Sequence, residues 1–282
     1  MSWFEAIVLG VVQGLTEFLP ISSTGHLRIV PAFAGWADPG AAFTAIIQLG
    51  TTVAVLIYFR EDLWRVARAW LTSLRSRDRW SPASGDARMG WYLILATIPI
   101  AVFGFIFKDQ IENGARDLYL IGTVLIVFGL VMWVADRLAS LDRSERSIRR
   151  GDALAIGLAQ ALALVPGVSR SGATISAGLL RGFNRETAAR FSFLLSLPAI
   201  VLAALFEMRG VISGSDPLET KAGDAISAGE VVVSCVFAFL VGYASIAFLL
   251  RFLTRHGLGV FVAYRLVLGV AVLALTASGA IS

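Results

Sequence analysis

Six long apolar segments divide the chain, and each is nearly free of charge. They cover Phe43–Phe59, Met89–Phe107, Leu118–Ala135, Phe191–Phe206, Val231–Leu250 and Leu258–Ala277. A helix needs about 20 apolar residues to cross the hydrocarbon core of a bilayer, so each segment is close to the length of one transmembrane helix. Nothing in the sequence resembles the ten-residue alternation of a membrane β-barrel. The pattern therefore predicts an all-α integral membrane protein.

The composition agrees with a membrane protein. Of the 282 residues, 57% are hydrophobic and 16% are charged, whereas a soluble domain carries about 25% charge. The net charge of +4 comes almost wholly from arginine, and the arginines gather between the apolar segments. This is the positive-inside pattern of membrane proteins, so we expect no nucleic-acid partner. With Cys235 as the single cysteine, the sequence excludes a disulfide framework and a thiolate metal cluster.

Two segments of the chain resemble each other in the order of their polar residues. Residues 10–25, GVVQGLTEFLPISSTG, align with residues 157–172, GLAQALALVPGVSRSG, when a one-residue slip is allowed on either side of the proline. In both segments an apolar helix ends at a proline, and a serine-rich turn with glycine follows. We therefore predict one membrane domain spanning 1–282, built from two related halves of approximately 1–146 and 147–282.

The loop charges predict the orientation in the membrane. Residues 60–88 contain seven arginines and residues 136–152 contain five, so both loops are expected on the cytoplasmic side. Residues 108–117 and 208–228 are slightly acidic, and we expect them on the external side.

The predicted sides of these loops require two re-entrant hairpins, which enter and leave the membrane on the same side. Only one full apolar segment separates residue 152 from residue 208, so residues 153–183 must enter and leave the membrane on the same side. Residues 3–26 form the corresponding hairpin from the external face. The predicted fold has six transmembrane helices plus two re-entrant helical hairpins in an inverted-topology repeat. In such folds, broken helices meet near the midplane and form the site.

The first hairpin carries a carboxylate in an apolar helix. Glu17 is costly to bury without a partner, and Gln13 lies four residues earlier on the same helical face. Together they could hold Mg²⁺ or Ca²⁺ that also binds phosphate oxygens. The alternative is a protonated Glu17 that forms a hydrogen bond between helices.

Hydroxyls and an imidazole follow the proline of this hairpin. A serine such as Ser22 or Ser23, close to His26, suits a nucleophile and its base. The alternative is that the serines and Thr24 only cap the next helix. The other histidine, His256, lies in a predicted cytoplasmic loop and is assigned no role.

The second hairpin carries an arginine among hydroxyls. Arg170 is the only charge between Asp152 and Arg181. Its planar guanidinium suits a phosphate or a carboxylate, and a following helix N-terminus adds free N–H groups. The alternative is an internal salt bridge with Glu17, which would also describe the empty state of an active site. Together the two hairpins predict a membrane protein that handles a lipid phosphate, as an enzyme or as a carrier.

The two motifs resemble the undecaprenyl-diphosphate phosphatase family of bacitracin-resistance proteins. The resemblance rests on EFLPISSTGH at residues 17–26, on PGVSRSGAT at residues 166–174, and on the order of apolar segments along the whole chain. It implies hydrolysis of undecaprenyl diphosphate to undecaprenyl phosphate and inorganic phosphate, which recycles the carrier lipid for peptidoglycan synthesis. It also implies a divalent cation and a bacterial plasma membrane location, with the active site facing the external side.

The resemblance also assigns roles to residues. It implies catalytic roles for Glu17, Ser23, His26 and Arg170, with Ser23 as the nucleophile and His26 as base, proton donor or alternative nucleophile. It implies metal binding by Glu17, whereas Gln13 stands where many family members have glutamate. The implied substrate contacts are Gln13, Ser22, Thr24, Ser169, Ser171 and Thr174. The expected partners are an isoprenoid diphosphate lipid and membrane lipids. The sequence leaves open whether two copies of the chain form a homodimer.

The predicted orientation can be tested by labelling. A tag inserted in residues 60–88 is expected to be protected from membrane-impermeant reagents in intact cells and to react after the membrane is permeabilised. Labelling of this loop from outside would overturn the predicted topology.

Overall fold

The computed structural model describes residues 1–75, 84–107, 117–213, 219, 220, 222, 223 and 225–281, with only the backbone for 203–213. These residues form α-helices joined by short connections. The helices are α1 (Trp3–Phe18), α2 (Ser23–Ala34), α3 (Gly40–Tyr58), α4 (Arg60–Ser73), α5 (Gly85–Ile106), α7 (Leu118–Leu138), α8 (Arg150–Ala161), α9 (Arg170–Leu180), α10 (Arg185–Ser213), α11 (Ala228–Leu253) and α12 (Gly259–Ala277). Two short 3₁₀ turns, Glu145–Ser147 and Leu162–Leu164, precede and follow α8.

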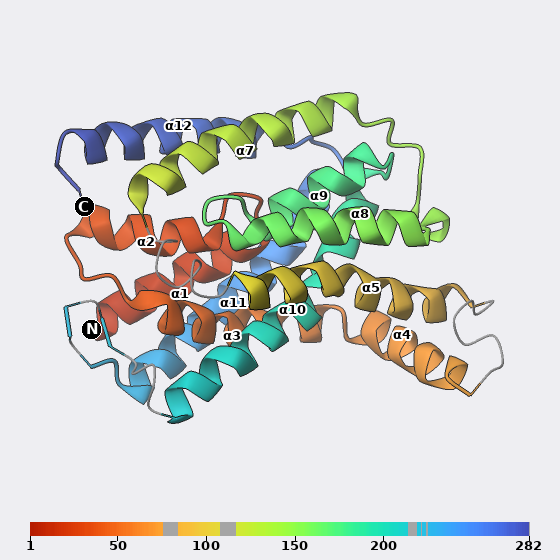
Figure 1. The fold of residues 1–282 in the computed structure, drawn as a ribbon, viewed down its shortest axis with the longest axis horizontal. Coiled ribbons are helices and arrows are strands. Elements are labelled where there is room, and N and C mark those ends of the chain that lie inside the picture. The colour runs from red at the N-terminus through yellow and green to blue at the C-terminus, as the bar shows by residue number, and fades with distance from the viewer. Residues whose placement is uncertain (76–83, 108–116, 214–218, 221, 224, 282) are drawn as a thin grey trace.

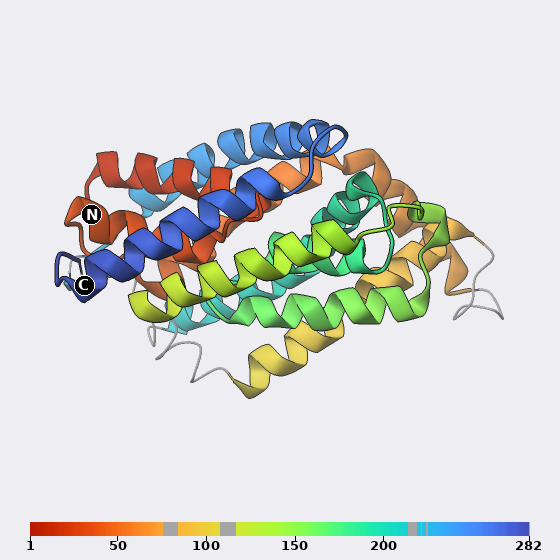
Figure 2. The same cartoon turned by 90° about the horizontal axis from the view of Figure 1, so that it is seen from above.

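The helices pack as an elongated bundle in which distant parts of the chain lie side by side (Figures 1 and 2). Helix α1 packs along α11, α8 packs along α5, and α12 packs along α7. Helix α3 lies against both α10 and α11. Each of the two hairpins therefore packs against a long helix of the other half of the chain.

Glycines allow the closest of these approaches. A side chain at Gly10 in α1 would collide with the carbonyl oxygen of Ser234 in α11. A side chain at Gly157 in α8 would collide with the backbone of Ala96 in α5. The sequence alignment pairs Gly10 with Gly157, so the two hairpins use the same position for the same kind of contact.

Among the described residues, five helices are long and apolar enough to cross a membrane: α3, α5, α7, α11 and α12. They correspond to five of the six predicted spans, and the all-helical prediction is confirmed. The sixth predicted span, Phe191–Phe206, lies within the 29-residue helix α10. The two predicted hairpins coincide with the helix pairs α1–α2 and α8–α9. The second helix of the first pair continues to Ala34, beyond the predicted end at residue 26.

The prediction of a loop over residues 60–88 is wrong for part of this segment. Its first part is helix α4, which packs on α5. Apolar residues recur every three or four positions here, so an amphipathic helix forms in spite of the arginines. Of the two predicted external loops, 108–116 and most of 214–224 lie outside the described residues.

A buried carboxylate joins the start of α8 to the segments around it. The Asp152 carboxylate accepts hydrogen bonds from Arg143 Nη2 at 2.6 Å, Arg181 Nε at 2.8 Å and the Arg149 N–H at 2.9 Å. Burial alone would raise the pKa of Asp152, but the two arginines outweigh it and hold this pKa below its ordinary value of 3.8. This cluster anchors both ends of the α8–α9 pair.

Replacing Asp152 tests this anchor. Asp152→Asn is expected to lower the free energy of unfolding in detergent by about 2–3 kcal/mol, the usual value for hydrogen bonds to a charged group. Because the folded pKa is depressed, the stabilisation is present above the unfolded pKa of 3.8 and is lost as the pH falls toward the folded pKa. Thermal unfolding against pH measures both effects. Asp142→Asn, at an exposed carboxylate of the same loop, is the control, and an equal loss there would contradict the assignment.

Candidate active site

The turns of the two hairpins have the same backbone geometry. Ser22 and Ser169 are the N-caps of α2 and α9, with φ angles of 78° and 73°. Their hydroxyls accept hydrogen bonds from the N–H groups of Gly25 at 3.3 Å and Gly172 at 3.2 Å. Positive φ angles are uncommon for serine and cost energy, and such strain is often found at functional sites. The structure thus shows that Ser22 caps α2 and that Ser169 caps α9.

The two hairpins meet at a buried ion pair. Arg170 Nη2, at the start of α9, lies 2.9 Å from Glu17 Oε1 near the end of α1. Glu17 is 5% exposed and Arg170 is 11% exposed at the side chain. Breaking such a pair by removing one partner costs about 3–5 kcal/mol, because the other charge stays buried. The structure therefore places together the carboxylate and the guanidinium that the sequence assigned to one site.

The second oxygen of Glu17 binds two further predicted site residues. Glu17 Oε2 accepts from Ser23 Oγ at 2.7 Å and from Gln13 Nε2 at 3.0 Å. Gln13 is fully buried, whereas Ser23 is half-buried. The Glu17 carboxylate can therefore accept the Ser23 proton directly.

Hydroxyls surround Arg170. Ser171 Oγ donates to the carbonyl of Leu19 at 3.1 Å and lies 3.1 Å from Ser169 Oγ. Thr174 Oγ1 lies 2.6 Å from the hydroxyl of Ser192 on α10. Arg170 Nη1 donates to the Ser192 carbonyl at 3.4 Å. The predicted hydroxyls are thus held in a network that links the α9 turn to the α1 turn and to α10.

The structure places the imidazole of His26 in a different arrangement from the one predicted. Its Nδ1 lies 2.7 Å from the Ser22 carbonyl, and its Nε2 lies 2.7 Å from the hydroxyl of Tyr264 on α12. A carbonyl only accepts, so Nδ1 carries a hydrogen and Nε2 is the nitrogen that can accept from Tyr264. The hydrogen bond of Ser23 goes to Glu17 instead. Thr24 lies beside these residues, its hydroxyl 3.4 Å from Ser22 Oγ.

Sequence reasoning missed Ser192, Tyr264 and Arg265. Ser192 and Tyr264 lie in apolar helices without a motif around them. Arg265 could have been found from the sequence, because an arginine within a predicted membrane span is a candidate functional residue.

The oxygen atoms of Glu17 and Gln13 are suitable ligands for a divalent cation that also binds a phosphate. Because Glu17 only accepts, the amide nitrogen of Gln13 faces it and Gln13 Oε1 points away. This Oε1 is buried and has no hydrogen-bond partner in the described part of the chain. Mg²⁺ is often held by one or two carboxylates together with substrate phosphates. Among the described residues, no cluster of three His, Cys, Asp or Glu side chains could hold a metal without such help.

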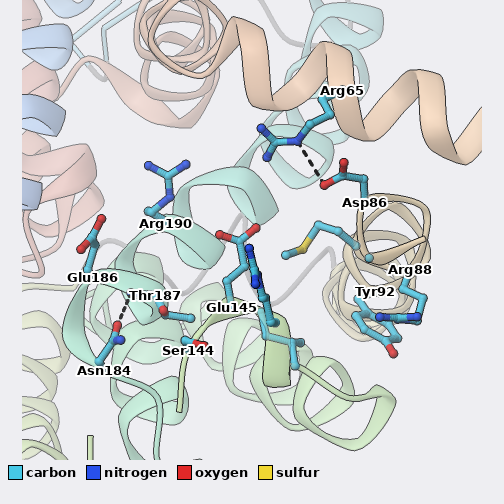
Figure 3. A pocket seen from close by; sticks show the side chains of 14 residues that line it. Arg65, Asp86, Arg88, Tyr92, Ser144, Glu145, Asn184, Glu186, Thr187 and Arg190 are labelled. Atoms are coloured by element: carbon cyan, nitrogen blue, oxygen red, sulfur yellow. Dashed lines mark hydrogen bonds and ion pairs between the residues drawn. The ribbon is translucent and has the colours of Figure 1, made fainter. Parts of the chain in front are cut away.

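A separate polar pocket of about 880 Å³ lies near the arginine-rich segments (Figure 3). Its lining contains none of the predicted site residues. In it, Arg65 Nε binds Asp86 at 3.1 Å and the Thr187 N–H binds Asn184 Oδ1 at 2.8 Å. This pocket is thus not where the carboxylate of Glu17, the hydroxyl of Ser23 and the guanidinium of Arg170 lie. We place the candidate active site at Glu17 on that chemistry.

Fold and site define a helical membrane protein with a polar, ion-paired cluster buried between two helix pairs. Residues 6–271 match the family model described as bacitracin resistance protein BacA. Over its full length the chain is 51% identical to the undecaprenyl-diphosphatase of Nocardioides sp. (strain JS614), covering 99% of that protein. It is 50% identical to the undecaprenyl-diphosphatase of Prosthecochloris aestuarii, covering 99% of each chain. It is 48% identical to that of Mycolicibacterium smegmatis, covering 100% of this chain and 99% of the relative.

The chain belongs to the bacitracin resistance protein BacA family.

The hydrogen bonds of His26 can be tested by a measurement that does not depend on enzymatic activity. Nitrogen NMR of histidine-labelled protein is expected to show His26 with a hydrogen on Nδ1 and a hydrogen-bonded Nε2. Tyr264→Phe should shift the Nε2 resonance, because it removes the O–H while keeping the ring. Tyr243→Phe, at a phenol on α11 whose ring contacts Tyr58, should leave it unchanged. A hydrogen on Nε2 with a bare Nδ1 would contradict the assignment.

Proposed function

We propose that this protein hydrolyses undecaprenyl diphosphate to undecaprenyl phosphate and inorganic phosphate, and so confers bacitracin resistance. The observation that carries the proposal is the buried Glu17 carboxylate, which binds Ser23, Gln13 and Arg170 at once. This combination of an acceptor for a hydroxyl proton and a cationic group for phosphate suits phosphoryl transfer. The full-length relatives named undecaprenyl-diphosphatase support the same substrate.

Ser23 is the nucleophile in this proposal. Its oxygen attacks the terminal phosphorus, and its proton passes to Glu17, whose Oε2 lies 2.7 Å away. The bond from that phosphorus to the bridging oxygen breaks, and undecaprenyl phosphate leaves as its anion. Glu17 then gives this proton to solvent, and water attacks the phosphorus of the phosphoserine. Glu17 accepts a proton from that water and passes it to Ser23 Oγ as the bond between Oγ and phosphorus breaks, and inorganic phosphate leaves. His26 is the less suitable nucleophile because its Nε2 already faces Tyr264.

The phosphates bind where α2 and α9 begin. The first N–H groups of a helix have no partner within the helix and attract anions. Arg170 releases Glu17 and binds a phosphate through its planar fork. Ser171 and Thr174 supply hydroxyls beside it, while Ser22, Thr24 and Ser169 shape the turns and contact the substrate from their edges.

A divalent cation, Mg²⁺ or Ca²⁺, would be held by Glu17 and by Gln13 Oε1, once the Gln13 amide turns so that Oε1 instead of Nε2 faces the carboxylate. When bound, it supplies positive charge that neutralises the diphosphate and the developing charge on the leaving group. The unpartnered Gln13 Oε1 supports this role. An amide brings no charge, so binding is expected to depend on the substrate phosphates.

The two hairpins are re-entrant and form an inverted-topology repeat with the site facing outward. Support comes from the matched capping serines, from Gly10 and Gly157 at matched close contacts, and from the arrangement of the chain ends. Both termini lie at one end of the bundle, and the arginine-bearing α4 and the start of α8 lie at the other (Figure 1). These ends correspond to the predicted external and cytoplasmic sides of a bacterial plasma membrane. With α10 as the sixth span, each half contributes three crossings.

A carrier that moves a lipid phosphate across the membrane is the second candidate. Broken helices that meet between two halves are the observation that favours it, because many transporters are built in this way. Hydrolysis separates the two functions, since a carrier releases no inorganic phosphate.

Phosphate release by purified protein in detergent tests the proposal. Wild-type protein with Mg²⁺ or Ca²⁺ should release inorganic phosphate from undecaprenyl diphosphate, and a chelator should abolish the release. Ser23→Ala and Glu17→Gln should each lower turnover by about 10²–10⁴-fold, because each removes a reacting group.

Ser278→Ala, at an exposed serine after α12, is the matched control and should keep wild-type turnover. No release under any metal condition would reject the enzyme and favour the carrier. Near-normal turnover in Ser23→Ala would move the nucleophile to His26 or to water.

A further inference from the structure

Arg265 is the bulkiest fully buried side chain among the described residues. It lies in the middle of α12, a helix with the length and composition of a membrane span. In the part of the chain that the structure describes, no carboxylate pairs with it. Its guanidinium donates instead to backbone carbonyls, namely those of Gly167 at 2.6 Å, Val168 at 3.2 Å, Leu125 at 3.3 Å, Pro20 at 3.4 Å and Val124 at 3.5 Å.

Three of these carbonyls belong to the turns of the two hairpins. Pro20 precedes the capping residue Ser22 by two positions, and Gly167 and Val168 come directly before Ser169. Each turn interrupts a helix, so its carbonyls lack helical partners. One guanidinium, with five N–H donors in a fixed plane, can satisfy carbonyls from both turns at once.

The Glu17–Arg170 ion pair also joins the two hairpins, but it cannot hold them together during turnover. Arg170 must leave Glu17 in order to bind a phosphate, and Glu17 must be free to accept the proton of Ser23. The contacts of Arg265 involve only backbone oxygens and need not change during the reaction. They are therefore a link between the hairpins that is available throughout the catalytic cycle.

We propose that Arg265 is a positioning residue that fixes the α1–α2 turn against the α8–α9 turn, so that Ser23 and Arg170 contact the same diphosphate. The inference rests on the proposed function. Helix α12 holds the first hairpin through two neighbouring residues, since Tyr264 binds His26 and Arg265 binds Pro20.

Two substitutions of different severity test the positioning role. Arg265→Lys keeps the charge but replaces the planar fork by one ammonium group, which cannot reach all three turn carbonyls. Arg265→Met removes the charge at a similar length. Arg255→Met, at an exposed position after α11, is the matched control. The measurements in detergent are the melting temperature, kcat and KM for undecaprenyl diphosphate, and the rise in melting temperature with inorganic pyrophosphate.

Arg265→Lys is expected to stay folded while kcat/KM falls by about 100-fold, the scale of a misplacement of about 1 Å. Most of the loss should lie in kcat, because the substitution changes how Ser23 and Arg170 are aligned on the diphosphate. The protection by pyrophosphate should disappear, and Arg255→Met should match the wild type. Wild-type kinetics in Arg265→Lys would overturn the proposal. Loss of the folded state in both Arg265 variants would also overturn it, because Arg265 would then serve stability alone.

Arg170→Lys separates this proposal from the proposed function. If the wild type neither hydrolyses the lipid nor is protected by pyrophosphate, the proposed function itself fails. If Arg170→Lys loses both properties while Arg265→Lys keeps them, the site stands and only the positioning role is rejected.

Discussion

A broken helix inside an apolar bundle leaves backbone groups that only the protein can satisfy. This chain contains two such breaks, after Phe18 and after Leu164, and the rest of the structure depends on how they are accommodated. Capping serines satisfy N–H groups, and Arg265 satisfies carbonyls from both breaks. A polar group that is buried without a hydrogen-bond partner costs several kcal/mol, so these contacts stabilise the two turns.

The same breaks create the chemistry. Ending α1 at the turn brings Glu17 close to the start of α2, where Ser23 lies, and ending the α8 segment brings Arg170 to the start of α9. Helix starts offer N–H groups and a positive dipole end to an anion. A continuous helix in either place would satisfy its own backbone and would offer no such groups. In the proposed function, the strained turns at Ser22 and Ser169 hold this geometry for a diphosphate.

Several features could be predicted from the sequence because they follow from local chemistry. Apolar length identified the membrane helices, and proline followed by serine and glycine located both breaks. Glu17 and Arg170 were identifiable because a charge in an apolar helix needs a partner. Helix α4 was missed because its arginines suggested a loop, whereas its apolar residues recur with helical spacing. The pairing of Ser23 with His26 was expected from their spacing, but the nearer acceptor for Ser23 is Glu17, a residue on another helix.

The sequence alone determined the helical membrane class, the two related hairpins and nearly all the polar residues of the site. These features depend on composition and on short spacings, which are local. The tertiary structure decided which residues face each other: Ser23 faces Glu17, His26 faces Tyr264, and Arg265 faces both turns. These partners are up to 245 residues apart in the chain. Only the packing of α1 and α2, α8 and α9, and α12 around one another brings them within hydrogen-bonding distance.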